Sequence, residues 1–410
     1  MRRLRFIHIG LAAAIISCSN LGLLSERYPE DFYRVPKLMP DETLDKNPTF
    51  IVYSDNQAGF RINDKFLARK NWATWKMLII PFYQLYLFGN GVAGAVNWYR
   101  HVPDLSGPEQ RMVRDAIYGS ALKNHIDFIL NTGDISAHDG RRPDHWASFL
   151  KINKHESNLL NEIPYLPAIG NHDRANDSTY GVPNYQAVFQ YPRFYVIDFP
   201  DGAIFVLDTN ILLDQKGEID DEYQNQLFRK WFVSSPGDGP SWLEKELSSR
   251  DVPFKIIAMH HPPISFNSHH RDWENDNFGK DLLTKRQKLL ELFDRYDVKL
   301  VFSGHDHIYQ HNVLFFKDKN SAKIDTVHFV VGGGGGTPLR EESGSREIKT
   351  IVNRYARLGY GVEQLVQKKS YHYSLVSVSS EKLTVAVYKI SDADGYEETI
   401  IDRYDITRRE

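Results

Sequence analysis

Five predicted β-strands in this chain each end in a run of aspartate, asparagine or histidine, and this pattern restricts the possible folds more than any other feature. The apolar strands cover residues 49–54, 127–131, 165–169, 254–259 and 298–303. Helical spacing of apolar residues, clearest at 109–125 and 282–296, fills parts of the intervals between them. Alternating strands and helices predict an α/β sandwich with sheets inside and helices outside.

The residues at these strand ends are of the types that bind metal ions. The runs are Asp55-Asn56-Gln57, Gly133-Asp134, Gly170-Asn171-His172-Asp173, His260-His261 and Gly304-His305-Asp306-His307. In such sheets ligands bind beyond the carboxyl ends of the strands, so the five segments are expected to share one site. Carboxylates and imidazoles suit manganese, iron and zinc.

The composition is that of a globular protein, with 41% hydrophobic and 25% charged residues. The net charge of −3 at pH 7 provides no overall basic field, so nucleic-acid binding is not expected. The chain has one cysteine, Cys18, which excludes an internal disulfide and a cysteine-based zinc site.

The first eighteen residues resemble a bacterial lipoprotein signal peptide. Three arginines precede an apolar stretch that is too short for a stable spanning helix. The sequence Ile15-Ile16-Ser17-Cys18 resembles a lipobox, which implies removal of residues 1–17 and acylation of Cys18. We expect a lipid anchor in the cell envelope, and Ser19 favours the outer membrane. A plain signal peptide or an uncleaved anchor are the alternatives.

The rest of the chain divides into a short tether and one domain. Residues 18–47 are polar and contain prolines, which predicts a tether, and residues 48–406 are predicted to form the domain. Residues 77–96 are apolar and carry no charge, but a membrane crossing there would separate strands that must share one site. A buried or lid-forming insertion and a patch that rests on the membrane are the other interpretations.

The series of motifs resembles the calcineurin-like metallophosphoesterase superfamily. It reads GD (133–134), GNHD (170–173), HHPP (260–263) and GHDH (304–307). The stretches HHPPISFNSHH and VVGGGGGTP are similar to its purple-acid-phosphatase-like branch. The resemblance implies a four-layer α/β/β/α sandwich, with two central mixed β-sheets flanked by helices.

The same resemblance implies a centre of two divalent metal ions, with manganese, iron or zinc favoured and magnesium also compatible. Such a pair activates a water molecule for attack on phosphorus. The implied ligands are Asp55 and His307 for the first ion, Asp134 as the bridge, and Asn171, His260 and His305 for the second ion.

Roles near the substrate also follow from the resemblance. His172 would hold the phosphate and protonate the leaving oxygen, with Asp173 orienting it. Asn171, His270 and Arg174 are the other expected substrate contacts.

The chain departs from the family pattern at the first metal. Gln57 stands where the superfamily usually has histidine, and Ala137 stands where the purple branch has a tyrosine ligand. The first ion would therefore have fewer ligands, or would use the Gln57 oxygen. No colour from a tyrosinate is expected.

Together these patterns predict a lipid-anchored, dinuclear-metal hydrolase of small phosphate esters, either a phosphomonoesterase or a phosphodiesterase. The alternative is a non-catalytic lipoprotein that keeps the same fold as a binding platform. Gln57 and the missing tyrosine support the alternative, whereas the intact set of strand-end ligands opposes it.

Overall fold

The computed structural model describes residues 21–39, 42–57, 108–175, 179–213, 219–275, 281–317, 324–391 and 397–408. Cys18, the signal peptide expected over residues 1–17 and the apolar segment 77–96 lie outside these ranges. Within the described ranges, no helix is long and apolar enough to cross a membrane.

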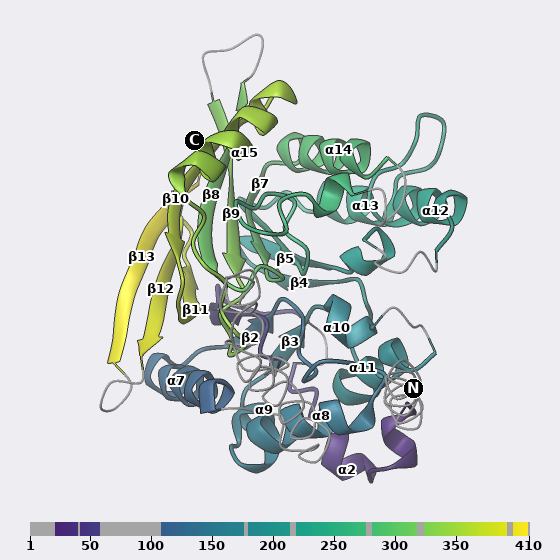
Figure 1. The fold of residues 1–410 in the computed structure, drawn as a ribbon, viewed down its shortest axis with the longest axis vertical. Helices are drawn as coiled ribbons and strands as arrows, with labels where there is room; N and C mark the ends of the chain where they lie inside the picture. Colours follow the sequence, from purple (N-terminus) through teal and green to yellow (C-terminus); the bar gives the residue numbers. More distant parts are fainter. Residues whose placement is uncertain are drawn as a thin grey trace, which may run out of the picture.

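Two mixed β-sheets occupy the centre of the described part of the chain (Figure 1). Sheet 1 contains, in order across the sheet, β13 (Glu397–Thr407), β12 (Lys382–Ser391), β11 (Tyr371–Val378), β1 (Thr49–Tyr53), β2 (Phe128–Asn131) and β3 (Tyr165–Pro167). Sheet 2 contains β10 (Gly361–Lys368), β8 (Tyr309–Lys317), β9 (Ile324–Gly332), β7 (Val298–Ser303), β6 (Phe254–Met259), β5 (Gly202–Leu207) and β4 (Tyr195–Phe199).

Each sheet has parallel strands at its centre. In sheet 1, β1 and β3 both run parallel to β2. In sheet 2, β5 and β7 both run parallel to β6. Parallel neighbours end at the same edge of a sheet, so the loops after these strands emerge together.

Helices cover the outer faces of both sheets (Figure 1). On the sheet 1 side lie α7 (Pro108–Asn124), α8 (Pro143–Leu150), α9 (Leu159–Glu162) and α11 (Gly181–Phe189), and on the sheet 2 side α12 (Asp221–Trp231), α13 (Trp242–Ser248), α14 (Leu282–Arg295) and α15 (Ser345–Arg357). Strand β5 shows the layering, because Ile204 and Val206 pack toward sheet 1 whereas Phe205 and Leu207 pack toward α12–α14. The predicted four-layer sandwich is confirmed.

Several local predictions are confirmed as well. The helix expected over 109–125 is α7. Helix α13 begins with the expected capping box, in which Ser241 Oγ accepts from the Glu244 amide at 3.1 Å and Glu244 Oε2 accepts from the Ser241 amide at 2.8 Å. The structure adds β8, β10, β13 and α15, for which the sequence pattern predicted no element.

The described part of the expected tether packs against the domain instead of extending from it. Leu24, Tyr33 and Val35 are buried, and Tyr33 belongs to a short helix, α2 (Glu30–Tyr33). The Val35 amide donates to the Val188 carbonyl at 2.8 Å. Apolar side chains spaced widely among polar ones give no periodic signal, which is why this packing was missed.

Glycines allow the strand ends to approach one another. A Cβ atom at Gly170 would lie 2.1 Å from the Asp134 backbone nitrogen and 2.2 Å from its Oδ1. A Cβ atom at Gly304 would lie 2.3 Å from Asp55 Oδ2. Only a hydrogen atom fits at these positions, so the glycines set the spacing between the two carboxylates and their neighbours.

We expect Gly170→Ala to lower the free energy of unfolding by about 1–3 kcal/mol and to displace Asp134, because the new methyl group meets backbone atoms. Gly119→Ala is the matched control, since Gly119 lies inside α7 with open space around it. That control should gain up to about 1 kcal/mol. Urea unfolding of both variants gives these values, and a Gly170 variant as stable as the wild type would contradict the packing described.

Candidate metal centre

The loops after β1, β2 and β3 of sheet 1 meet the loops after β6 and β7 of sheet 2. Asp134 Oδ2 lies 3.2 Å from His260 Nε2, and the same nitrogen lies 2.9 Å from Asn171 Oδ1. Asp55 Oδ1 lies 3.5 Å from His307 Nε2. One ligand atom from each of Asp55, Asp134 and His260 lies within 4.8 Å of the others, so distant segments converge as predicted.

The two aspartates each leave one buried oxygen without a hydrogen-bond donor in the described structure. Asp55 Oδ2 accepts from the His305 amide at 2.9 Å, and Asp134 Oδ1 accepts from the His172 amide at 2.8 Å. Asp55 Oδ1 and Asp134 Oδ2 are buried without a hydrogen-bond partner when the rings are neutral, and a protonated His260 places its Nε2 3.2 Å from Asp134 Oδ2. A buried carboxylate oxygen without a donor is costly, and a cation offsets that cost, so these residues fit a metal site.

Backbone carbonyls orient two of the imidazoles. His260 Nδ1 lies 2.9 Å from the Thr132 carbonyl, which leaves Nε2 to face the carboxylates. His307 Nδ1 lies 3.2 Å from the Pro338 carbonyl, which leaves Nε2 toward Asp55. When one ring nitrogen donates to a carbonyl, the other carries the lone pair that a metal ion needs.

Protonation of the imidazoles depends on their surroundings. Burial lowers the pKa of His307 to about 3 and lowers the pKa of His305 well below its usual range, so both rings are neutral. Burial also acts to lower the pKa of His260, but the Asp134 carboxylate outweighs it and raises that pKa to about 9. Metal binding at His260 therefore displaces a proton.

The pKa values of the two carboxylates, Asp55 and Asp134, also depend on their surroundings. Burial, with a contribution from Asp134, raises the pKa of Asp55 to about 6. Burial acts to raise the pKa of Asp134 as well, but His260 and His172 hold it well below its ordinary value. Asp134 is therefore ionised throughout the physiological range, whereas ionised Asp55 is poorly compensated.

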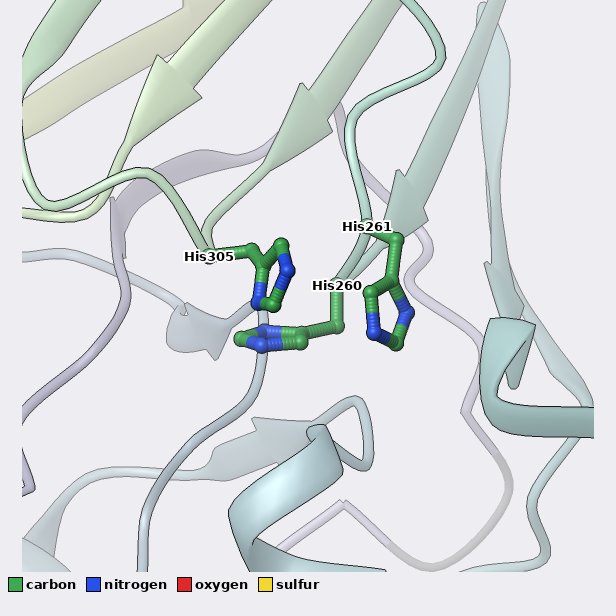
Figure 2. Close-up of side chains that lie close together, drawn as sticks. All are labelled: His260, His261 and His305. Carbon is green, nitrogen blue, oxygen red and sulfur yellow. The ribbon is translucent and has the colours of Figure 1, made fainter. Parts of the chain in front are cut away.

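His261 lies beside the centre, although it is not one of the implied ligands. Figure 2 shows the rings of His260, His261 and His305 close together beyond the ends of β6 and β7. His261 Nδ1 lies 2.7 Å from Thr209 Oγ1, and its Nε2 is buried without a hydrogen-bond partner among the described residues. One nitrogen of each of the three rings lies within 4.8 Å of the others.

Gln57 is placed beside His307. Its Nε2 lies 3.3 Å from His307 Nε2, and its Oε1 is buried without a partner among the described residues. The amide nitrogen is thus the atom that faces His307, and the Gln57 oxygen as a ligand stays a prediction.

The acid candidate His172 is held by a backbone group. His172 Nδ1 lies 2.6 Å from the His138 carbonyl, and its Nε2 lies 4.0 Å from Asp134 Oδ2. We expected Asp173 to orient this ring directly, and the structure corrects that expectation. The Asp173 carboxylate accepts three backbone amides, those of Ile135, Ser136 and Gly170.

Asp173 therefore fixes the loops that carry His172 and Asp134 rather than the ring itself. Burial, together with the nearby Asp134 carboxylate, raises the pKa of Asp173 to about 7. Its carboxylate group caps the first turn of α10 (Asn171–Arg174).

The structure turns His269, rather than the expected His270, toward the site. The His269 ring centroid lies 3.8 Å from that of His305. His270 Nδ1 lies 2.7 Å from the Asn267 carbonyl, and the residue lines a separate cavity of about 400 Å³ with the start of α15. Adjacent histidines in a turn point in different directions, and the sequence SHH does not show which one faces inward.

Arg174 stays a predicted substrate contact, and the structure shows that it also lines a cavity. It is buried, its Nη1 donates to the Asn210 carbonyl at 3.4 Å, and it lines a cavity of about 390 Å³ with Arg193 and Trp231. None of the residues that line this cavity is a predicted metal ligand.

Comparison with known proteins agrees with this geometry. The family model described as "Calcineurin-like phosphoesterase" matches residues 101–309, which is half of the chain. The chain belongs to the calcineurin-like phosphoesterase family. The resemblance read from the motifs GD, GNHD, HHPP and GHDH is confirmed.

Relatives of this calcineurin-like phosphoesterase include purple acid phosphatase 1 of Ipomoea batatas, which is 25% identical over 271 residues, 60% of this chain and 52% of that protein. The probable glycerophosphodiester phosphodiesterase GpdQ of Arcobacter nitrofigilis is 26% identical over 189 residues, 45% of this chain and 58% of that protein. The first curated relatives that the chain matches are covered over 35% to 58% of their own length.

Among solved structures, the purple acid phosphatase PPD1 from yellow lupin seeds is similar, with a TM-score of 0.54 and 15% identity. The match covers 89% of this chain and 54% of that one. At this identity the likeness supports the fold alone. It agrees with the two mixed sheets flanked by helices described above.

Replacement of Asp55 is expected to change the stability of the metal-free protein and the binding of metal in opposite directions. Folded Asp55 keeps its proton up to about pH 6, whereas the unfolded chain releases it near pH 3.8. As the pH rises between these values, the free energy of unfolding of the metal-free protein therefore falls by about 3 kcal/mol. Asp55→Asn keeps an acceptor for the His305 amide and removes the charge.

We therefore expect metal-free Asp55→Asn to be more stable than the metal-free wild type at pH 7 and equally stable near pH 3. The variant should also lose the rise in melting temperature that added Mn²⁺ or Zn²⁺ gives the wild type. Thermal unfolding across pH, with and without a chelator, measures both effects. A variant with the wild-type pH dependence would contradict the assignment.

Proposed function

We propose that this chain hydrolyses phosphate esters at a centre of two divalent metal ions. The observation that carries the proposal is that Asp134, Asn171 and His260 converge from both sheets beside Asp55 and His307, around two buried carboxylate oxygens. Family membership and the printed names of the relatives, a phosphatase and a phosphodiesterase, support the same class of reaction.

The residues divide between two metal positions. Asp55 and His307 would hold the first ion, Asp134 would touch both, and the second would be held by Asn171, His260 and His305. When bound, such ions supply positive charge beside the phosphoryl group and lower the pKa of water. The imidazole-rich donor set favours manganese, iron or zinc.

His172 is the proposed general acid. Its Nδ1 proton is directed to the His138 carbonyl, so Nε2 is the nitrogen that faces the substrate side. The side chain is partly exposed, at 29%, in contrast to the buried ligands around it. When protonated, Nε2 can donate to the leaving oxygen.

We expect His172→Ala to reduce hydrolysis of an aryl phosphate by 10²–10⁴-fold, which is the usual contribution of a general acid, while metal content stays at the wild-type value. His155→Ala is the control, because His155 stacks on Phe32 away from the predicted ligands. Turnover and elemental analysis of both variants test this, and undiminished activity in the His172 variant would refute the assigned role.

The reaction class within phosphate esters needs its own experiment. Turnover of a mono-aryl and a bis-aryl phosphate is compared with Mn²⁺, Fe²⁺, Zn²⁺ and Mg²⁺. If the protein binds metal but hydrolyses neither ester with any of these ions, the binding platform is favoured over the enzyme.

We further propose that acylated Cys18 anchors the protein to a membrane of the cell envelope, on the basis of the lipobox-like sequence. Cys18→Ser should move the protein from the membrane pellet to the soluble fraction, because the attachment site for the acyl chains is lost. Fractionation of cells that express each form measures this shift. Retention of the variant in the pellet would contradict the anchor.

A further inference from the structure

One acidic side chain near the centre was not singled out from the sequence. Asp272 begins a short 3-10 turn, Asp272–Glu274, between β6 and α14. Its Oδ2 lies 2.9 Å from His305 Nε2 and 2.6 Å from His269 Nδ1. The side chain is largely buried, at 15% exposed, so two imidazoles meet one shielded carboxylate oxygen.

Arg340 establishes the protonation pattern of this group. A guanidinium can only donate hydrogen bonds, and Arg340 Nη2 lies 2.8 Å from His269 Nε2. His269 Nε2 is therefore the acceptor nitrogen, and the proton of the neutral ring resides on Nδ1, directed at Asp272. In the same way, neutral His305 donates from Nε2 to Asp272 and keeps its lone pair on Nδ1.

We propose that Asp272 is a positioning residue of the metal centre, which fixes His305 so that Nδ1 is its ligand atom. The inference rests on the proposed function and deepens it. His305 then differs from His260, whose Nδ1 is held by a backbone carbonyl and whose Nε2 faces the carboxylates. A carboxylate behind a ligand histidine fixes its tautomer and increases its basicity.

Asp272 serves behind the ligand rather than as a ligand itself. Its Oδ2 already accepts from two ring nitrogens, those of His269 and His305, with which it forms one of the groups whose ligand atoms lie within 4.8 Å of one another. The carboxylates with an unpartnered buried oxygen, Asp55 and Asp134, lie in a different group around His260.

A matched pair elsewhere in the chain provides the control. Asp402 on β13 accepts from His311 Nδ1 at 2.8 Å and from the Tyr309 hydroxyl at 2.6 Å, so it also joins a histidine to a carboxylate. Neither partner is a predicted metal ligand. Asp402→Asn therefore perturbs a similar buried bond without touching the proposed centre.

The experiment uses the full chain with the substitutions Asp272→Asn, Asp272→Glu and Asp402→Asn. Affinity for Zn²⁺ and Mn²⁺ is measured by competition with a chromophoric chelator, and folding is checked by circular dichroism. Asp272→Asn should bind one metal equivalent about 10–100-fold more weakly. Asp272→Glu should recover part of this loss, because it restores the charge, and Asp402→Asn should bind as the wild type does.

Wild-type affinity in folded Asp272→Asn would overturn the inference, and so would an equal loss in Asp402→Asn. If Asp272→Asn does not fold, the smaller loss expected in Asp272→Glu decides the question, and wild-type affinity there overturns it. A wild-type protein that binds metal but hydrolyses no ester would refute the proposed function while the affinities still test Asp272. A wild-type protein that binds no metal would overturn both.

Discussion

The burial of Asp55 and Asp134 beyond the ends of two neighbouring strands is the constraint on which the rest of the structure depends. In each carboxylate one oxygen accepts a hydrogen bond from a backbone amide, and the other oxygen is buried without a hydrogen-bond partner. Such an arrangement opposes folding in the absence of a cation and is stabilised when one is present. The glycines that allow close approach and the neutral imidazoles of His305 and His307 belong to the same arrangement.

The residues of the site come from both sheets. Asp55, Asp134 and Asn171 follow strands of sheet 1, whereas His260 and the histidines after β7 follow strands of sheet 2. A cation shared by these ligands would join the sheets at one edge of the sandwich. Further along the sheets, the contact of Asp402 with His311 joins them through a second buried polar group.

Groups behind the ligands decide how the site presents its atoms. The Thr132 carbonyl selects Nε2 of His260, the His138 carbonyl selects Nε2 of His172, and the Asp272 carboxylate selects Nδ1 of His305. Asp173, which looked like a partner of His172 in the sequence, instead binds three backbone amides and holds the loops. The chemistry of each ring thus depends on an atom that no motif names.

The sequence by itself determined the five strands that lead into the site, helices such as α7 and α13, and the residues at the end of each of those strands, because periodicity and capping act over a few neighbouring positions. The motifs then identified the family and predicted the metal ligands. Only the tertiary structure decided that His269 rather than His270 faces the site, that Arg174 lines a separate cavity, and that the segment around Leu24 packs on the domain. It also brought Asp272 to His305, 33 residues away. These outcomes depend on contacts between side chains that are far apart in the sequence, and local spacing carries no information about such contacts.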